Sequence, residues 1–460
     1  MTAVLGIDSS TQSTKALLVD ADDGTVLEQR QVAHPPGTEV DPRAWRAAVD
    51  EATDGLLERA EAVSVAAQQH GMVALDAAGE PVRKALLWND VRSAAAAEDL
   101  VREWGGPDEC ARLVGSVLVA SFTVSKLRWM RDADPDAAAR TESVLLPHDY
   151  ISAHLAEPGT APFTDRGDAS GTGYFSTRED RWRPELVQSA LGREVALPRV
   201  VAAGAVAAHT GRGAVLASGT GDNMGAALGM GLRETDVLVS VGTSGVASTR
   251  SPVAPTDGTG TVTGFADALD GFLPMTVTLN AAQILDLQAA LLGIDHDRLS
   301  ELALQAPPGA HGLTLSPYYG GERTPNRPGA TGVWSGLSGD TDRADLARAA
   351  FEALACSLAD AVDHLAEHLG QRGEDVLLVG GAARSPALQE IAAGIFGQPV
   401  TLPPPAEYVA LGAARQAAWA LAGTASPPDW PRPVGTVVDA PPTPQVRASY
   451  AELRDRVGSW

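Results

Sequence analysis

The chain has 460 residues, a length that suits two domains better than one ordinary core. Hydrophobic residues make up 44% and charged residues 20%, so each domain can bury a substantial core. The formal net charge is −23, which argues against nucleic acid or an anionic membrane as the main partner. The two cysteines lie far apart in the sequence, as is typical of proteins from a reducing compartment.

The amino terminus leads directly into strand-like sequence. Residues 1–10 read MTAVLGIDSS and contain neither the basic segment nor the long apolar segment of a signal peptide. No uncharged apolar run reaches the length of about 18 residues that a membrane span needs. We therefore predict a cytoplasmic protein with no membrane partner.

Residues 4–20 have the pattern of a β-hairpin, with two apolar segments joined by a polar loop at 9–15. The loop tip would gather backbone N–H groups into a concavity that binds phosphate oxygens. Ser10 and Thr11 would add hydroxyl donors and Lys15 a positive charge, while Asp8 could bind Mg²⁺. An ordinary polar turn is the alternative interpretation.

Two polar clusters follow apolar strand-like segments farther along the first half. Gln69 and His70 come after 62–67, and Trp88, Asn89 and Asp90 come after 85–87. Ligand sites in α/β proteins lie at such strand ends, and amides and imidazoles suit sugar hydroxyls. The alternative is that His70 and Trp88 are partly buried structural residues.

A glycine-containing turn at 218–221 leads to Asp222 and Asn223. A carboxylate on such a turn could accept the proton of an alcohol as the alcohol attacks phosphorus. Capping of a helix that begins near 223 is the competing role for Asp222.

A second hairpin pattern covers 236–249, with Thr243 and Ser244 at its tip. The recurrence indicates two domains of related design, whose loops could clamp one polyphosphate across an interdomain cleft. The sequence contains neither a Walker motif nor a GxGxxG after a strand.

Near the carboxyl end, a predicted helix over 345–369 precedes a strand at 376–379, the pair Gly380–Gly381 and a helix from about 386. Strand, glycines and helix form a unit that favours a nucleotide. His364 and His368 have a spacing that can bind zinc, but no third ligand follows, and we interpret them as solvated helix residues.

These segments, in this order, resemble the FGGY carbohydrate kinases over nearly the whole chain. The matching segments are GIDSSTQSTK (6–15), QQHG (68–71), WNDVR (88–92), SFTVSKLRW (121–129), LLPHDY (145–150), GDN (221–223), SVGTSGV (240–246), GGERTPNR (320–327), GVWSGL (332–337) and ALGAAR (410–415). Within the family, they are most similar to the members that phosphorylate D-xylulose.

The resemblance implies an α/β fold of two ribonuclease-H-like domains of the actin/hexokinase type, flanking an interdomain cleft. The expected domains are residues 1–235, with the sugar site and first phosphate loop, and 236–460, with the nucleotide site. We expect the last helix to pack back on the first domain.

The implied reaction is ATP- and Mg²⁺-dependent phosphorylation of D-xylulose to D-xylulose 5-phosphate. The alternatives are another pentulose or pentitol as substrate, or an inactive sugar-sensing homologue. A homodimer is a further expectation.

The resemblance also implies roles for single residues. Asp222 corresponds to the catalytic base and Asp8 to a residue near the metal, with Asp222 also placed at the metal. The expected sugar-binding residues are Gln69, His70, Trp88, Asn89, Asp90, Asp222 and Asn223, and the expected nucleotide-binding residues are Ser10, Thr11, Lys15, Thr243, Ser244, Gly380, Gly381 and Ala382.

Three residues depart from the family pattern. Gln69 replaces a common Met, Thr220 stands where a Gly often precedes the Gly-Asp pair, and Ala382 stands where a third Gly is usual. Glycerol kinases of the same family carry Arg–Glu in place of His70–Gly71, which argues against glycerol as the substrate.

Overall fold

The computed structural model describes residues 2–370 and 372–457, and the chain divides into two compact units. The first unit comprises the chain up to Leu232 together with Pro252–Leu273 and Ala406–Arg432. The second unit comprises Arg233–Ser251, Pro274–Pro405 and the chain from Pro433 onward. Pro252–Leu273 and Ala406–Arg432 thus belong to the first unit although they come after residue 235 in the sequence.

The first unit is built on a seven-stranded mixed sheet. Its order is β13 (Val206–His209), β14 (Val215–Ala217), β5 (Ala62–Ala67), β1 (Ala3–Ser9), β2 (Ser13–Asp20) and β3 (Val26–Ala33), with β15 (Thr220–Gly221) also paired to β5. Strands β1, β2 and β3 are antiparallel neighbours, whereas β5 runs parallel to β1, and β14 and β15 run parallel to β5.

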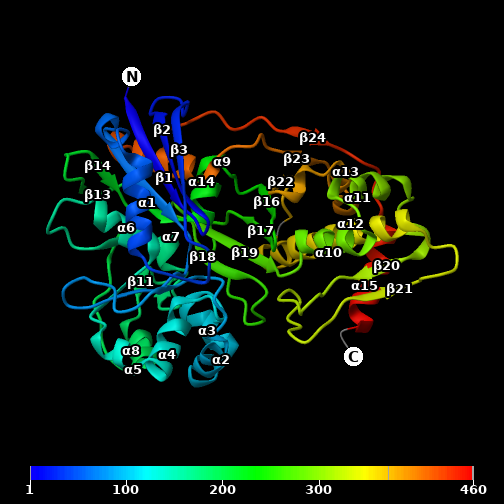
Figure 1. Ribbon diagram of the computed structural model, residues 1–460, viewed down its shortest axis with the longest axis horizontal. Helices are drawn as coiled ribbons and strands as arrows, with labels where there is room; N and C mark the ends of the chain where they lie inside the picture. Colours follow the sequence, from blue (N-terminus) through cyan, green and yellow to red (C-terminus); the bar gives the residue numbers. More distant parts are fainter. Residues whose placement is uncertain (1, 371, 458–460) are drawn as a thin grey trace. The chain divides into compact units, whose positions relative to one another are not determined.

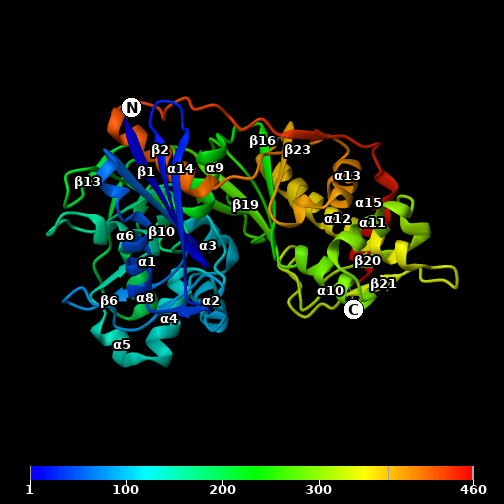
Figure 2. The ribbon, with the colours of Figure 1, turned by 45° about the horizontal axis from the view of Figure 1, so that its top comes forward.

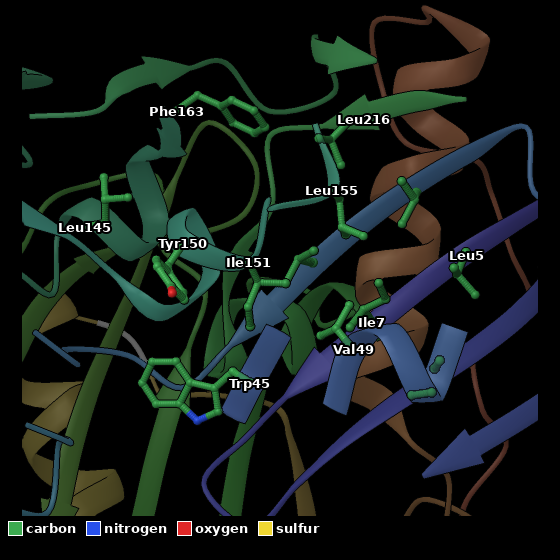
Figure 3. Packing of buried hydrophobic residues seen from close by; sticks show 14 of the residues in the cluster. Leu5, Ile7, Trp45, Val49, Leu145, Tyr150, Ile151, Leu155, Phe163 and Leu216 are labelled. Atoms are coloured by element: carbon green, nitrogen blue, oxygen red, sulfur yellow. The ribbon is translucent and has the colours of Figure 1, made fainter. Parts of the chain in front are cut away.

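Successive side chains of β1 point to opposite faces of this sheet, as expected for a strand, and both faces are buried. Leu5 and Ile7 join a core with α1 (Arg43–Thr53) and α6 (Pro147–Leu155), where Figure 3 shows Trp45, Val49 and Ile151. Val4 points to the opposite face and packs against α14 (Tyr408–Ala422), which lies beside β1 in Figure 1.

Glycines let α14 approach α9 (Asp222–Met230) closely. A Cβ atom on Gly412 would overlap the carbonyl oxygen of Gly225, and one on Gly229 would overlap that of Tyr408. Only residues without a side chain allow the two backbones to meet at this distance. This contact fixes the position of α9, the helix that begins at Asp222.

The other described elements of the first unit surround this sheet. They are β4 (Glu39–Val40), η1 (Leu57–Arg59), β6 (Val73–Leu75), β7 (Ala85–Leu86), α2 (Ala94–Glu103), α3 (Pro107–Val114), α4 (Thr123–Ala133), α5 (Pro135–Arg140), β8 (Ser143–Leu145), β9 (Phe163–Asp165), α7 (Arg166–Ala169), β10 (Phe175–Ser176), β11 (Arg181–Trp182), α8 (Pro184–Leu191), β12 (Arg199–Val201) and β18 (Thr263–Ala266).

The second unit repeats the strand order of the first. Within this unit, the strand order is β19 (Phe272–Thr278), β17 (Gly245–Thr249), β16 (Asp236–Val241), β22 (Asp375–Val379), β23 (Val400–Leu402) and β24 (Thr436–Val438). As in the first unit, a central strand has antiparallel neighbours on one side and parallel ones on the other. The predicted α/β fold of two ribonuclease-H-like domains is confirmed, as are both predicted hairpins.

Helix α12 (Arg343–Leu369) forms the core of the second unit, where α10 (Ala282–Leu292), α11 (His296–Gln305) and α13 (Pro386–Phe396) pack against it (Figure 2). Its first residue follows Asp342, whose carboxylate accepts the N–H groups of Ala344 and Asp345 in a capping box. The remaining described elements are η2 (Ala310–Gly312), β20 (Thr314–Ser316), β21 (Val333–Ser335), η3 (Ala382–Arg384) and α15 (Pro444–Val457).

The last helix and the absence of a membrane span were two further expectations. Helix α15 belongs to the second unit and packs there on α12, α13 and β20, which differs from the expected packing on the first domain. Its buried Val446, Tyr450 and Leu453 give it an apolar face for that core. No helix in the described ranges, 2–370 and 372–457, is long and apolar enough to cross a bilayer.

Candidate functional site

The first unit gathers three of the predicted site residues at one edge of its sheet. In the pairing register, Ala66 of β5 lies between Asp8 of β1 and Thr220 of β15. All three strands are parallel, so their carboxyl ends meet at the same edge. Gln69 follows β5 and Asp222 follows β15, so both emerge beside Asp8.

Asp222 is the first residue of α9, and Gly221 occupies the N-cap position. The competing capping role therefore falls to a different residue. The Asp222 Oδ1 atom accepts hydrogen bonds from the backbone N of Asn223 at 2.8 Å and from its Nδ2 at 3.1 Å. Burial, together with the negative charges of Asp8 and Asp168, raises the pKa of Asp222 to about 7. A carboxylate with this pKa is suited to accept a proton near neutral pH, and the residue as a whole is partly exposed.

Gln69 determines how the amide of Asn223 is oriented. Its Oε1 accepts a hydrogen bond from Asn223 Nδ2 at 3.0 Å, so the NH₂ group of Asn223 faces both Gln69 and Asp222. The Gln69 side chain is buried, and its Nε2 has no hydrogen-bond partner within the described residues. A buried donor without a partner is costly unless a ligand satisfies it, so Gln69 is suited to bind a hydroxyl.

His70 stands in a strained backbone conformation beside aromatic rings. Its φ is +66°, in the left-handed region that residues other than glycine rarely adopt. Its Nδ1 donates to the carbonyl of Gly171 at 2.5 Å, and its ring lies 5.1 Å from that of Phe122 and 5.6 Å from that of Phe265. The carbonyl and the two rings hold the imidazole in one orientation, as a binding group requires.

The segment Trp88–Asp90 has one buried and two exposed side chains. Trp88 is 43% exposed and donates from its Nε1 to the Thr11 hydroxyl at 2.9 Å, and Asn89 is also exposed. Asp90 is buried and accepts from Thr38 and from Arg92. Burial opposes ionisation of Asp90, but these hydrogen bonds lower its pKa overall. The structure thus presents Trp88 and Asn89 outward, while Asp90 orders the loop.

The first hairpin tip is a cluster of charged groups. Ser10 donates a short hydrogen bond to Asp8, and Lys15 Nζ lies 3.8 Å from Asp8 and 2.6 Å from Glu407. Burial raises the pKa of Asp8 to about 6, against the opposing effects of Ser10 and Lys15. Glu407 is a residue that the sequence analysis missed, because 392 positions separate it from Lys15.

The second unit holds a pocket of about 420 Å³ at the tip of its hairpin. Of the predicted nucleotide-binding residues, Thr243, Gly381 and Ala382 line it, whereas Ser244 and Gly380 do not. The full lining is Val241, Gly242, Thr243, Ala282, Leu285, Asp286, His296, Asp297, Ser300, Phe351, Gly381, Ala382, Arg384, Ser385 and Pro386. A Cβ on Gly380 would lie 2.5 Å from the carbonyl oxygen of Val241, so a glycine is required beside the pocket. The residues from α10 and α11 were missed, since no local motif marks them.

Comparisons with known proteins agree with this arrangement. Residues 3–229 match the N-terminal domain of the FGGY family of carbohydrate kinases, and residues 237–421 match its C-terminal domain. A xylulose kinase from Streptomyces coelicolor is 44% identical over 455 residues, covering 95% of this chain and 92% of that protein. A xylulose kinase from Escherichia coli is 32% identical, covering 90% of this chain and 89% of that protein.

Solved structures give the same result. The crystal structure of xylulose kinase from Bifidobacterium adolescentis superimposes with a TM-score of 0.92 at 39% identity, covering 98% of this chain and 99% of that one. A second xylulose kinase structure, from Brucella ovis, has a TM-score of 0.88 at 28% identity and covers 99% of this chain and 98% of that one. With both family domains matched in order and close relatives aligned along nearly its whole length, this chain belongs to the FGGY family of carbohydrate kinases.

Proposed function

We propose that the chain transfers the γ-phosphoryl group of ATP to D-xylulose, giving D-xylulose 5-phosphate, with Asp222 as the general base. The observation that carries the proposal is the position of Asp222, a partly exposed residue with a pKa of about 7, at the edge where parallel strands end. A base is most effective when its pKa lies near the working pH. The xylulose kinases among the relatives support the choice of sugar.

In this proposal, the sugar binds through groups of the first unit. Gln69 Nε2, which has no partner among the residues that the structure describes, donates to one hydroxyl, and the fixed imidazole of His70 binds another. Trp88 offers an exposed ring to a sugar face, and the amides of Asn89 and Asn223 add polar contacts. Asp90 contributes by ordering the loop that carries Trp88.

The nucleotide binds through backbone-rich loops. Ser10, Thr11 and Lys15 form the first phosphate loop, and Lys15 exchanges part of its contact with Glu407 for phosphate oxygens. In the second unit, Thr243, Ser244, Gly380, Gly381 and Ala382 contact the nucleotide, and the 420 Å³ pocket has room for its base and ribose.

Asp8 and Asp222 are suited to hold a magnesium ion. The charge of Asp8 raises the pKa of Asp222, so the two carboxylates interact, and a divalent cation relieves that repulsion. Carboxylates are the ligands Mg²⁺ prefers beside substrate phosphates, and when bound it neutralises phosphate charge.

The proton transfer uses a specific oxygen of Asp222. Oδ1 is occupied by two donors of Asn223, so Oδ2 accepts the proton as the sugar oxygen attacks the γ-phosphorus. One phosphorus–oxygen bond forms, the bond to the β-phosphate oxygen breaks, and ADP leaves. Positioning and electrostatic stabilisation provide most of the catalysis in such transfers.

The experiment is a coupled ADP-release assay on Asp222→Asn with D-xylulose and a panel of other ketoses and polyols. We expect kcat to fall by about 10²–10⁴-fold because the general base is lost, while D-xylulose still binds in calorimetry. The surface variant Asp136→Asn serves as the control and should retain full activity. Turnover by Asp222→Asn would refute the assignment of the base. Absence of sugar-dependent ADP release by the wild type with every sugar would refute the kinase proposal.

The choice of Mg²⁺ over other divalent ions, a cytoplasmic location and a homodimer stay predictions. A metal titration of the activity and light scattering of the purified protein test the first and the last.

A further inference from the structure

A buried ion pair lies directly beneath the turn that carries Asp222. His148 of α6 donates from Nδ1 to Asp168 Oδ2 of α7 at 2.6 Å. Both side chains are fully inaccessible to solvent. Neither belongs to the residues proposed to touch sugar, nucleotide or metal, although the LLPHDY segment was among those that identified the family.

The surroundings of His148 require a doubly protonated ring. Its Nε2 lies 3.2 Å from the carbonyl oxygen of Ser218 and 3.3 Å from Asp149 Oδ1. A carbonyl can only accept, so Nε2 carries a proton in addition to the one that Nδ1 donates. Burial alone would lower the pKa of His148, but the charges of Asp149 and Asp168 outweigh it and raise the pKa to about 10.

The turn at 218–221 rests on this pair through several contacts. Besides the Ser218 carbonyl, Gly219 adopts a φ of +74° with its Cα against the imidazole, where a Cβ would come within 2.5 Å of His148 Cδ2. Thr220 donates from its hydroxyl to Asp165 Oδ2 at 2.8 Å. Thus the Thr that replaces a common Gly of the family makes a specific hydrogen bond.

Asp165 connects that contact to Asp168. Its carboxylate accepts the N–H groups of Gly167 at 2.9 Å and Asp168 at 2.8 Å, and so caps α7. Asp168 Oδ1 has no hydrogen-bond partner within the described residues, and it lies 3.2 Å from the point that a Cβ of Gly221 would occupy. The carboxylate therefore lies directly under the residue that precedes Asp222.

From the opposite side, Gln416 of α14 fixes the same turn. Its Nε2 donates to Ser218 Oγ and to the carbonyl of Gly219, each at 3.0 Å, and its Oε1 accepts from Ser64. The turn is thus held between a neutral amide on one side and an ion pair on the other. An amide would be sufficient for hydrogen bonding alone, and burying charges costs several kcal/mol per ion unless they are well paired.

A metal site is the other chemistry that these side chains suggest, since ligand atoms of His148, Asp149 and Asp168 lie within 4.8 Å of one another. Tetrahedral ligands about 2.1 Å from zinc are separated by roughly 3.4 Å. The 2.6 Å between His148 Nδ1 and Asp168 Oδ2 is instead the length of a charge-assisted hydrogen bond. The geometry favours an ion pair.

We propose that His148 and Asp168 are a positioning pair for Asp222: they hold the turn 218–221 so that the carboxylate at its end meets the attacking hydroxyl. The inference rests on the proposed function of Asp222. Both residues act through the turn and touch no substrate. A displacement of about 1 Å in a catalytic group can cost about 100-fold in rate, which is the scale of effect that loss of the pair should produce.

The test compares His148→Gln, Asp168→Asn, the double variant and His148→Lys, which keeps a cation. For each single neutral variant we expect kcat at saturating substrates to fall about 10- to 100-fold. The Kd of D-xylulose, measured by calorimetry, should change less than about threefold, because the sugar-binding side chains are untouched. The double variant should lose no more than the worse single one, and His148→Lys should recover part of kcat.

A matched control removes a buried charge elsewhere. Glu352 of the second unit is buried and accepts from Arg348 Nε at 2.7 Å and from the Gly309 N–H at 2.9 Å. Glu352→Gln should lower the melting temperature without lowering kcat, which separates stability from positioning. If His148→Gln does not fold, Thr220→Val removes a single hydrogen bond to Asp165 and should still lower kcat with an unchanged Kd.

Two results would overturn the inference: an unchanged kcat in a folded His148→Gln or Thr220→Val variant, or losses that simply multiply in the double variant. Asp222→Asn is assayed in parallel. Activity of Asp222→Asn would refute the proposed base itself. An inactive Asp222→Asn beside a fully active His148→Gln would refute only the positioning pair.

Discussion

The two hairpin tips share one strand pattern but differ in the chemistry they present. In the first unit, the tip between β1 and β2 carries Asp8, Ser10 and Lys15. Ser10 and Lys15 contact Asp8, and Lys15 also contacts Glu407. In the second, the tip between β16 and β17 is formed by Gly242, Thr243 and Ser244 and opens on a pocket. Under the proposed function, one topology would provide acid–base and metal-binding side chains in the first unit, and backbone and small residues for the nucleotide in the second.

This difference between the two hairpin tips predicts that activity falls most when a charged residue of the first tip is replaced. Asp8→Asn keeps the shape but removes a proposed metal ligand, so we expect kcat to fall by at least about 100-fold and the Mg²⁺ concentration needed for half-maximal rate to rise. The measurement is a magnesium titration of the initial rate. An unaltered magnesium dependence would contradict the proposal that side chains of the first tip bind the metal.

In the second unit, substitutions should act on stability, through the conformation of the backbone. Gly380 has a φ of +103° and its absent Cβ would meet the backbone of Val241, so Gly380→Ala should destabilise the protein by about 1–3 kcal/mol. No atom of residues 2–370 or 372–457 lies within 4 Å of the Cβ position of the neighbouring Gly381, its chain neighbours aside, so Gly381→Ala is the matched control for stability. Calorimetry of both variants tests this prediction, and equal melting temperatures for Gly380→Ala and Gly381→Ala would contradict it.

A smaller and graded effect is expected from pH. Asp222 must be ionised to act as the base, and its pKa of about 7 is above the usual value, so kcat/KM should fall as pH drops through 7, about tenfold per unit below that point. Added Mg²⁺ favours the ionised form and should move this limb to lower pH. A flat profile between pH 5.5 and 8 would argue that Asp222 is not the titrating base.

The smallest effect should come from the hydrogen bond between Trp88, proposed to contact the sugar, and Thr11, proposed to contact the nucleotide. Trp88→Phe keeps an aromatic ring but removes the hydrogen bond to Thr11, which is worth about 1 kcal/mol, so the KM values should rise about three- to fivefold with little change in kcat. Thr11→Val should have a similar effect, and the double variant should be no worse than either. Purely additive losses would mean that the two residues act independently.

Sequence patterns predicted those parts of the molecule that depend on local order. Apolar segments joined by polar loops in residues 4–20 and 236–249 predicted both hairpins, and the amphipathic pattern after 345 predicted α12, because period and burial are encoded by neighbouring residues. The resemblance to the family placed Asp222, and the register of β1, β5 and β15 shows why it lies beside Asp8.

Residues that act through distant contacts could not be predicted in the same way. Glu407 reaches Lys15, and His148 reaches Asp168 and the Ser218 carbonyl, only after the chain has folded, and no spacing in the sequence signals these contacts. Likewise, Asp286 and His296 contribute to the pocket from helices whose patterns indicate only packing.

The return of residues 406–432 to the first unit has a consequence for synthesis on the ribosome. Val4, Leu17 and Val19 are covered by α14, which is translated some 400 residues later. Until then, Val4, Leu17 and Val19 lack this cover in the nascent amino-terminal half, and exposed apolar surface of this kind promotes aggregation. A fragment ending near 235 would remain in that unfinished state, whereas one that also supplies the helix from Tyr408 to Ala422 could complete the layer.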